Sequence, residues 1–219
     1  HLIAKEACRI IQEHQANKPL FLYVPFNAVH GPHQVPGRYE QPFQKLKGVR
    51  RTYAGMLAAM DEGVGQIIAA LKEKGSFDNT LIIFSSDNGP EDTHPNPGDK
   101  FYYSVGSTGG LRGRKRSLYM GGLNTPFIVR WPGRVQPGTV CDRLVHQADV
   151  MATFGAIAQQ PLPDNAGEDS FSLLPLLDGK DKEIRNSAVS QSMRGLLAVR
   201  RGPWKLIFGQ GSGGWTDGK

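Results

Sequence analysis

The chain has 219 residues, of which 39% are hydrophobic and 21% are charged, and these proportions exclude a disordered chain. The net charge of +6, from 26 basic and 20 acidic residues, favours an anionic partner such as a sulfate or phosphate ester, an anionic glycan or a nucleic acid. We expect no nucleic acid, because the basic residues are dispersed. No apolar run approaches about 20 residues, so we also expect no membrane-spanning segment.

Helical and extended patterns alternate along the first three quarters of the chain. Apolar residues at three- and four-residue steps predict helices, and short continuous apolar runs predict buried strands. The polar, glycine-rich residues 91–113 predict a long loop. In chain order, the expected elements are a helix over 2–14, a strand at 20–26, a helix over 51–74 ending at Gly75, strands at 81–84 and 126–131, a helix after an Asp149 cap, and strands at 196–200 and 204–208.

This alternation predicts an α/β fold in which helices sandwich a largely parallel sheet. Residues 160–167 are typical of a connector, so we place a core domain at 1–165 and a second, smaller region at 166–219. Ligands of parallel sheets bind beyond the carboxyl ends of the strands. That rule selects the loop with His30 and His33 after the first strand, and Asp87-Asn88 after the second.

Asp87 and Asn88 carry hard oxygen donors of the kind that suits Ca²⁺ or Mg²⁺. Asp-Asn-Gly is also a common turn sequence, and a turn is the stronger interpretation of these residues taken alone. The buried strand expected just before them favours a metal half-site. Two ligands cannot hold such a cation, so further ligands would have to come from elsewhere.

Two other loops contain groups that suit an anionic ester. His30 and His33 could donate a hydrogen bond to an anionic oxygen or protonate a leaving group. Lys115, in a basic segment flanked by glycines, could hold a sulfate or phosphate oxygen. Each is more often an ordinary loop residue when taken alone. Together they indicate hydrolysis of an anionic ester, without distinguishing sulfate from phosphate.

Four motifs follow one another along the chain: Phe21-Leu22-Tyr23-Val24-Pro25-Phe26-Asn27-Ala28-Val29-His30-Gly31-Pro32, Phe84-Ser85-Ser86-Asp87-Asn88-Gly89-Pro90-Glu91, Gly110-Leu111-Arg112-Gly113-Arg114-Lys115 with Gly121-Gly122, and Arg130-Trp131-Pro132-Gly133. These ordered segments resemble the sulfatase family of the alkaline-phosphatase superfamily, most closely its arylsulfatase B-type and N-acetylgalactosamine sulfatase members. The order and spacing match over nearly the whole chain.

The resemblance implies an alkaline-phosphatase-like fold and a sulfuric ester hydrolase. Asp87 and Asn88 would be ligands of Ca²⁺, with Mg²⁺ as the other candidate. His30 and Lys115 would be catalytic, His30 protonating the departing alcohol and Lys115 holding a sulfate oxygen. His33 and Arg114 are expected to bind the substrate, a sulfate ester that we expect to be a sulfated carbohydrate. The family's nucleophile is a formylglycine made from a cysteine in a Cys-x-Pro-Ser-Arg motif.

The chain departs from the family pattern in three places. Neither Cys8 nor Cys141 begins a Cys-x-Pro-Ser-Arg motif, and the family's N-terminal aspartate metal ligands have no counterpart. Because the chain begins inside a helical pattern, we expect both in a preceding part of a longer protein, and we expect residues 1–219 alone to be inactive. Met120 and Asn124 stand where the family has charged Glu and Arg. Residues 166–219 would be part of the family's small antiparallel C-terminal subdomain.

Two competing hypotheses remain beside the sulfatase. One is a phosphatase, phosphodiesterase or phosphonate hydrolase of the same superfamily. The other is a non-catalytic relative that binds sulfated glycans through its basic segment, Arg112, Arg114, Lys115 and Arg116. Family habit predicts a secreted, periplasmic or lysosomal location, and the sequence leaves the oligomeric state open.

Overall fold

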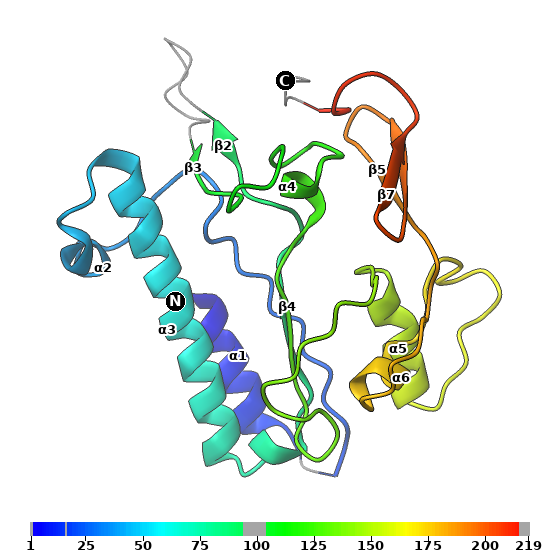
Figure 1. Ribbon diagram of the computed structural model, residues 1–219. Helices are drawn as coiled ribbons and strands as arrows, with labels where there is room; N and C mark the ends of the chain where they lie inside the picture. The colour runs from blue at the N-terminus through cyan, green and yellow to red at the C-terminus, as the bar shows by residue number, and fades with distance from the viewer. Residues whose placement is uncertain (1, 16, 94–103, 215–219) are drawn as a thin grey trace. The chain divides into compact units, whose positions relative to one another are not determined.

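The computed structural model describes residues 2–15, 17–93 and 104–214, which form two compact units (Figure 1). The first unit comprises residues 1–80 and 91–107, and the second comprises residues 81–90 and 108–219. This division is based on contacts between segments and differs from the expected boundary after residue 165. The expected division into a core domain and a C-terminal region stays a prediction.

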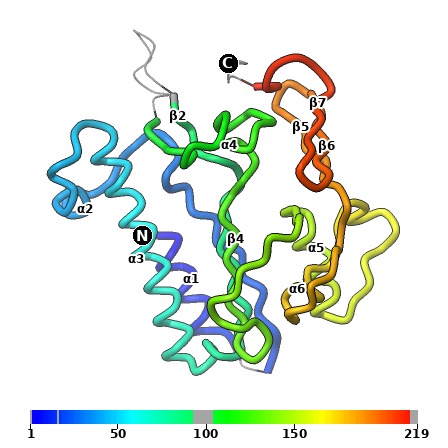
Figure 2. The backbone as a smooth tube through the Cα atoms, viewed as in Figure 1, coloured from blue at the N-terminus to red at the C-terminus, as the bar shows by residue number. Residues whose placement is uncertain are grey.

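Two long helices form the centre of the first unit. Helix α1 (Leu2–Glu13) lies beside helix α3 (Gly48–Glu73), as both ribbon and tube views show (Figures 1 and 2). Gly63 makes the close approach possible, because a Cβ atom there would lie 3.1 Å from the Ala4 Cβ. The face of α1 that buries Ala4, Ala7 and Ile11 follows the helical period of its apolar residues. Both predicted helices are confirmed.

Helix α3 ends where the sequence predicts. Gly75 has a positive φ of 70°, its N–H donates to the Lys72 carbonyl, and the Ser76 N–H donates to the Leu71 carbonyl. This pattern is a Schellman motif, for which glycine is the favoured residue. By length and composition alone α3 is also long and apolar enough to cross a membrane, as many core helices of water-soluble proteins are. The expectation of no membrane span therefore stays a prediction.

Short elements complete the first unit. Strands β2 and β3 pair antiparallel within the region expected to be a long loop, and residues 94–103 of that region lie outside the described residues. The remaining elements of this unit are α2 (Gly37–Glu40), the 3-10 helices η1 (Gln41–Phe43) and η2 (Phe77–Asn79), β2 (Asp92–Thr93) and β3 (Ser104–Val105).

The buried strand expected at 20–26 is wrong. These residues have no regular secondary structure, and the side chains of Phe21 and Tyr23 are 71% and 77% exposed. Exposure alternates along the segment with a two-residue period, with Phe26 on the less exposed side. The apolar run therefore indicated an extended chain correctly, but a strand also needs a neighbouring strand to complete its ladder of hydrogen bonds.

The second unit begins with two paired strands. β1 (Ile82–Ser85) pairs with β4 (Phe127–Arg130), with Ile83 opposite Val129, so both strands expected here are confirmed. The pair is antiparallel, as is every strand pair within the described ranges, and the largely parallel sheet is not confirmed. Among its described residues, the connection from β1 to β4 contains one helix, the short α4 (Met120–Leu123), and the strands β2 and β3. Parallel neighbours are usually joined by a crossover helix, and α4 has only four residues.

Three antiparallel strands form a small sheet near the C-terminus (Figure 2): β5 (Ala188–Gln191), β6 (Leu197–Arg201) and β7 (Trp204–Ile207). The two strands predicted between 196 and 208 are confirmed. Ala188 and Ala198 are buried on one face of this sheet, whereas Trp204 is 80% exposed on the other. The face with the two alanines is therefore the one that packs inward.

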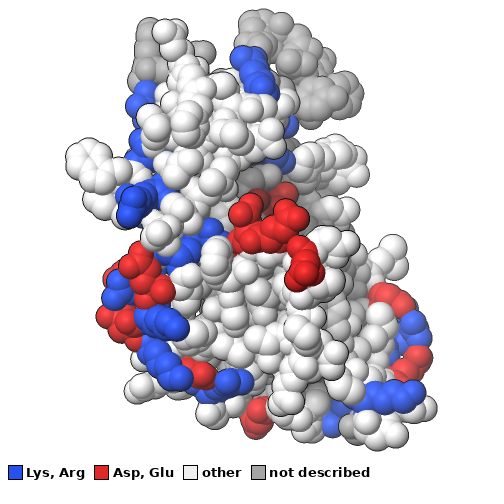
Figure 3. Space-filling model, turned by 90° about the vertical axis from the view of Figure 1, so that its right-hand side faces the viewer, with Lys and Arg blue, Asp and Glu red and all other residues white. Residues whose placement is uncertain are grey.

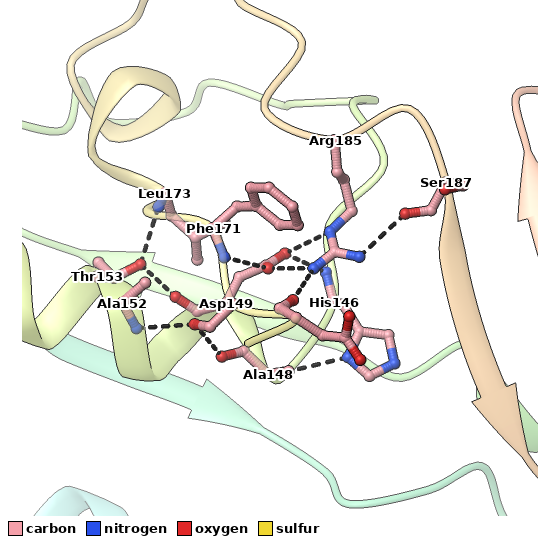
Figure 4. A network of polar contacts seen from close by, with 11 residues as sticks. His146, Ala148, Asp149, Ala152, Thr153, Phe171, Leu173, Arg185 and Ser187 are labelled. Atoms are coloured by element: carbon pink, nitrogen blue, oxygen red, sulfur yellow. Dashed lines mark hydrogen bonds and ion pairs between the residues drawn. The ribbon is translucent and has the colours of Figure 1, made fainter. Parts of the chain in front are cut away.

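Helix α5 (Asp149–Ile157) is anchored by a buried ion pair (Figure 4). Asp149 was expected to cap this helix, but it is the first helical residue and Ala148 occupies the cap position. Its completely buried carboxylate accepts hydrogen bonds from the backbone N–H groups of His146 and Phe171 and from the guanidinium of Arg185. These bonds fix α5, and α6 (Leu174–Leu177) beyond it, to the segment that leads into β5.

Candidate active site

Asp87 and Asn88 lie in the loop that begins at the end of β1, as expected. The Asp87 side chain is exposed and Asn88 is half-buried. The Asn88 amide nitrogen donates to the Gly89 carbonyl at 2.9 Å, and the Ser86 hydroxyl donates to the Asn88 carbonyl at 3.1 Å. The Asp87 carboxylate and the Asn88 side-chain oxygen are hydrogen-bond acceptors, and neither of these two hydrogen bonds uses them.

The loop with Asp87 and the loop with Lys115 are joined through their backbones. The N–H of Lys115 donates to the Pro90 carbonyl at 2.9 Å, and the N–H of Gly89 donates to the Gly122 carbonyl at 2.8 Å. Lys115 itself is half-buried. The structure thus brings together three of the predicted site residues, Asp87, Asn88 and Lys115, within the second unit.

Glycines allow this approach. A Cβ atom on Gly89 would lie 1.9 Å from the Gly121 carbonyl oxygen, and one on Gly121 would lie 2.2 Å from the Gly113 oxygen. A Cβ atom on Gly122 would lie 2.4 Å from the Ser117 oxygen. These distances are far shorter than any real carbon–oxygen contact. The Gly-Gly pair in the sequence motif is therefore required because backbone packs directly on backbone.

The C-terminal residues hold the Lys115 loop from its other side. Leu118 is fully buried, its N–H donates to the Ser212 carbonyl at 2.8 Å, and its own carbonyl accepts from the Lys205 ammonium at 2.6 Å. A Cβ atom on Gly214 would lie 1.9 Å from the Arg116 oxygen. Sequence reasoning did not identify Leu118, Lys205 or Ser212 as supports of the loop, because these contacts join residues more than 85 positions apart.

Arg114, the expected substrate-binding residue, is half-buried in the same loop. Its backbone N–H lies 3.3 Å from the Ser117 hydroxyl, which fixes the turn before Leu118. The neighbouring Arg112 guanidinium stacks 4.0 Å from the centre of the Tyr119 ring. Elsewhere, basic and acidic side chains are interspersed in small groups on the face shown in Figure 3, and neither sign covers it.

His30 and His33 belong to the first unit. The exposed His30 ring places its Nδ1 2.8 Å from the Gly31 carbonyl oxygen. The His33 ring lies against the ring of Tyr53, with 5.9 Å between centres, and its Nε2 lies 3.4 Å from the Ser104 hydroxyl. Burial lowers the pKa of His33, and the nearby His30 lowers it further. Burial raises the pKa of the Tyr53 hydroxyl.

The donor types at Asp87 and Asn88 fit a hard cation such as Ca²⁺, which prefers carboxylate and amide oxygens. Two ligands are too few, because Ca²⁺ takes six to eight oxygens. Among the residues that the structure describes, no group of three or more His, Cys, Asp or Glu side chains could hold a metal ion. By donor type, Asp87 and Asn88 are therefore compatible with part of a larger calcium site.

Comparison with known proteins places these features in a family. The sulfatase family model matches residues 1–159. The chain is 36% identical to an N-acetylgalactosamine-6-O-sulfatase of Bacteroides thetaiotaomicron over 208 residues, which are 94% of this chain and 39% of that protein. It is also 36% identical to human arylsulfatase A over 202 residues, 90% of this chain and 37% of that protein.

A solved structure is similar in fold as well. The protein Ps i-CgsB, crystallised in complex with k-i-k-neocarrahexaose, matches with a TM-score of 0.79 and 28% identity, over 94% of this chain and 45% of that one. The chain spans less than half the length of each of these three proteins. The family match covers both the loop after β1 and the glycine-rich loop with Lys115. The chain belongs to the sulfatase family.

Proposed function

We propose that the protein containing this chain is a sulfuric ester hydrolase that removes sulfate from sulfated sugars. The observation that supports this proposal is the backbone junction between the Asp87-Asn88 loop and the Lys115 loop, because two side chains with oxygen donors and one with an ammonium group belong to segments that hydrogen-bond to each other. The carbohydrate substrate is supported by one relative's name, N-acetylgalactosamine-6-O-sulfatase, and by the oligosaccharide bound to a structural neighbour.

In this proposal, Asp87 and Asn88 are two of the oxygen ligands of a Ca²⁺ ion. Mg²⁺ is the less suited cation, because it demands a near-ideal octahedron and retains its water. When bound, the cation would offset the charge of the sulfate group. The remaining ligands and the formylglycine nucleophile would come from outside residues 1–219, since no Cys-x-Pro-Ser-Arg motif is present in the sequence.

Lys115 would hold a sulfate oxygen and stabilise the charge that develops as the ester bond breaks. The joined backbones would hold the Lys115 backbone in place before the substrate arrives, which lowers the cost of orienting its side chain during the reaction. Arg114, on the same loop, would contact the substrate.

The two histidines would have different roles. Burial lowers the pKa of His33, which favours the neutral ring, so His33 suits a hydrogen-bonding contact with the substrate better than proton donation. His30 is more exposed and would protonate the departing alcohol oxygen.

Parallel assays of the whole protein with an aryl sulfate and an aryl phosphate test the proposal. The sulfatase interpretation requires a higher kcat/KM for the sulfate, and a preference for phosphate would support the phosphatase or phosphodiesterase alternative. Binding of sulfated glycan without turnover of either ester would support the non-catalytic alternative. Residues 1–219 alone should hydrolyse neither ester.

A further inference from the structure

Two basic side chains face each other across strands β6 and β7. Arg200 lies directly opposite Lys205 in the antiparallel register, and Ala188 of β5 lies opposite Arg200 on its other side. Residues that are directly opposite share a face, and Ala188 is buried, so both cations project from the inward face of the sheet. Like charges in directly opposed positions destabilise a sheet.

The surroundings of this pair offer little compensation. The Lys205 ammonium donates to the Leu118 carbonyl at 2.6 Å and lies 3.5 Å from the Met120 sulfur. One Arg200 Nη atom lies 3.9 Å from the same sulfur. A thioether sulfur is only a weak hydrogen-bond acceptor and has no charge. Within the described ranges neither cation forms a salt bridge with a carboxylate.

Both side chains are half-buried, so water compensates their charge only in part. Burial lowers the pKa of Lys205, and the charge of Arg200 lowers it further. An ammonium has three N–H donors and a guanidinium has five. The contacts of Lys205 and Arg200 with other described residues engage fewer donors than these. The pair therefore combines unmet positive charge with hydrogen-bond donors that converge on Met120.

We propose that Lys205 and Arg200 together bind one small oxoanion of the sulfate or phosphate class beside the Met120 side chain. Such an ion accepts several charge-assisted hydrogen bonds at once and removes the repulsion between the two cations. The site uses different side chains from the proposed contact of Lys115 with the reacting sulfate. It does not depend on the catalytic proposal, since it concerns binding alone.

Calorimetric titration of the whole protein with sodium sulfate at low ionic strength tests this site. All measurements use a Lys115→Ala background, so that sulfate binding at the proposed reaction site does not contribute. The key variant is Met120→Glu, which places a carboxylate between the two cations and should occupy the site internally. We expect it to weaken the apparent Kd for sulfate by at least about tenfold, which corresponds to about 1.4 kcal/mol.

Arg201→Gln is the matched control. Arg201 is exposed, and with its register partner Trp204 it lies on the face of the sheet opposite to Arg200 and Lys205. It removes one positive charge near the site and should leave the Kd unchanged. Titration with sodium phosphate and with a sulfated monosaccharide distinguishes a free inorganic ion from a substrate-borne group as the ligand.

Thermal unfolding establishes that each variant is folded before its affinity is compared. Equal sulfate affinity with and without the Met120→Glu substitution would overturn the proposal. So would the absence of saturable sulfate binding to the Lys115→Ala protein that retains Met120. A loss of the same size in Arg201→Gln would show that general charge, rather than the Lys205 and Arg200 pair, attracts the ion. None of these results would bear on turnover of sulfate esters, which is measured separately.

Discussion

The backbone N–H of Lys115 donates to the carbonyl of Pro90 at 2.9 Å, and this hydrogen bond joins two segments that are 25 positions apart in the chain. A second bond, from Gly89 to Gly122, parallels it. The position of the Lys115 backbone relative to the Asp87-Asn88 loop therefore depends on these two backbone hydrogen bonds. Substitutions that separate the two backbones should affect both loops together.

Replacing Gly89 with alanine should separate them. The new Cβ atom would lie 1.9 Å from the Gly121 carbonyl oxygen, so one loop must move. We expect the free energy of unfolding to fall by at least about 2 kcal/mol, because backbone rather than a flexible side chain is the obstacle. Urea denaturation followed by circular dichroism measures this change.

Gly65→Ala is the control for that substitution. Gly65 is an exposed helix position, and a Cβ atom there would have no other atom within 4 Å. Alanine at this position should stabilise the protein by about 0.5–1 kcal/mol, since it restricts the unfolded chain. Similar effects of the two substitutions would contradict the packing that we describe.

The Asp149 and Arg185 pair should be essential for the stability of the second unit. Asp149→Asn removes one charge from a pair whose carboxylate is completely buried, and leaves the Arg185 guanidinium uncompensated. We expect a loss of about 3–5 kcal/mol in the free energy of unfolding. Chemical denaturation of the variant beside the unsubstituted protein provides the measurement.

Asp181→Asn, in an ion pair at the surface, is the control for Asp149→Asn. Asp181 accepts a hydrogen bond from Arg143 at 2.6 Å, but both side chains are exposed. Solvent weakens such pairs, so this substitution should scarcely change stability. Equal losses in the two variants would show that burial does not determine the strength of the Asp149 pair.

His33 should make stability depend on pH in mildly acidic solution. Its pKa in the folded protein lies below the ordinary value of 6.5, because it is partly buried and faces His30. Between the two pKa values the unfolded chain binds more protons than the folded one, so stability falls as the pH falls through this window. His33→Gln should reduce that slope. Denaturation midpoints measured from pH 5 to pH 7 would contradict this if the variant retained the full slope of the unsubstituted protein.

Removal of calcium should abolish activity of the whole protein if Asp87 and Asn88 are ligands. Asp87→Asn keeps the shape of the side chain and removes its charge, so we expect the calcium concentration that restores half of the activity to rise by about tenfold or more. Asp92→Asn provides a control on a nearby carboxylate. Activity that is indifferent to chelation would exclude the proposed role of the cation.

Local patterns predicted local structure well in this chain. The apolar stripe of α3 and the glycine at its end define the helix because both act within a few residues. The apolar runs at β1 and β4 predicted strands for the same reason. Strand direction, however, depends on the path of the connection, and the segment 20–26 shows that an apolar run does not supply its own pairing partner.

The candidate site also has features that local residue types predict and features that depend on contacts between distant segments. The Asp-Asn-Gly turn and the basic glycine-rich segment could be found from residue types, and their residues suggested the chemistry. That Gly89, Gly121 and Gly122 allow the two loops to touch could not be inferred from one segment at a time. The support of Leu118 by Lys205 and Ser212 was equally hidden, because it depends on how the C-terminal residues fold back on the loop.

The most direct test of the central claim is the rate of aryl sulfate hydrolysis by the whole protein and by its Lys115→Met variant, with Lys182→Met as a control on an exposed lysine of the same unit. We predict that the Lys115 substitution lowers kcat by about 100-fold or more, because a cation that stabilises transition-state charge is lost. The control should retain full activity. Undiminished turnover of aryl sulfate by Lys115→Met would contradict the account.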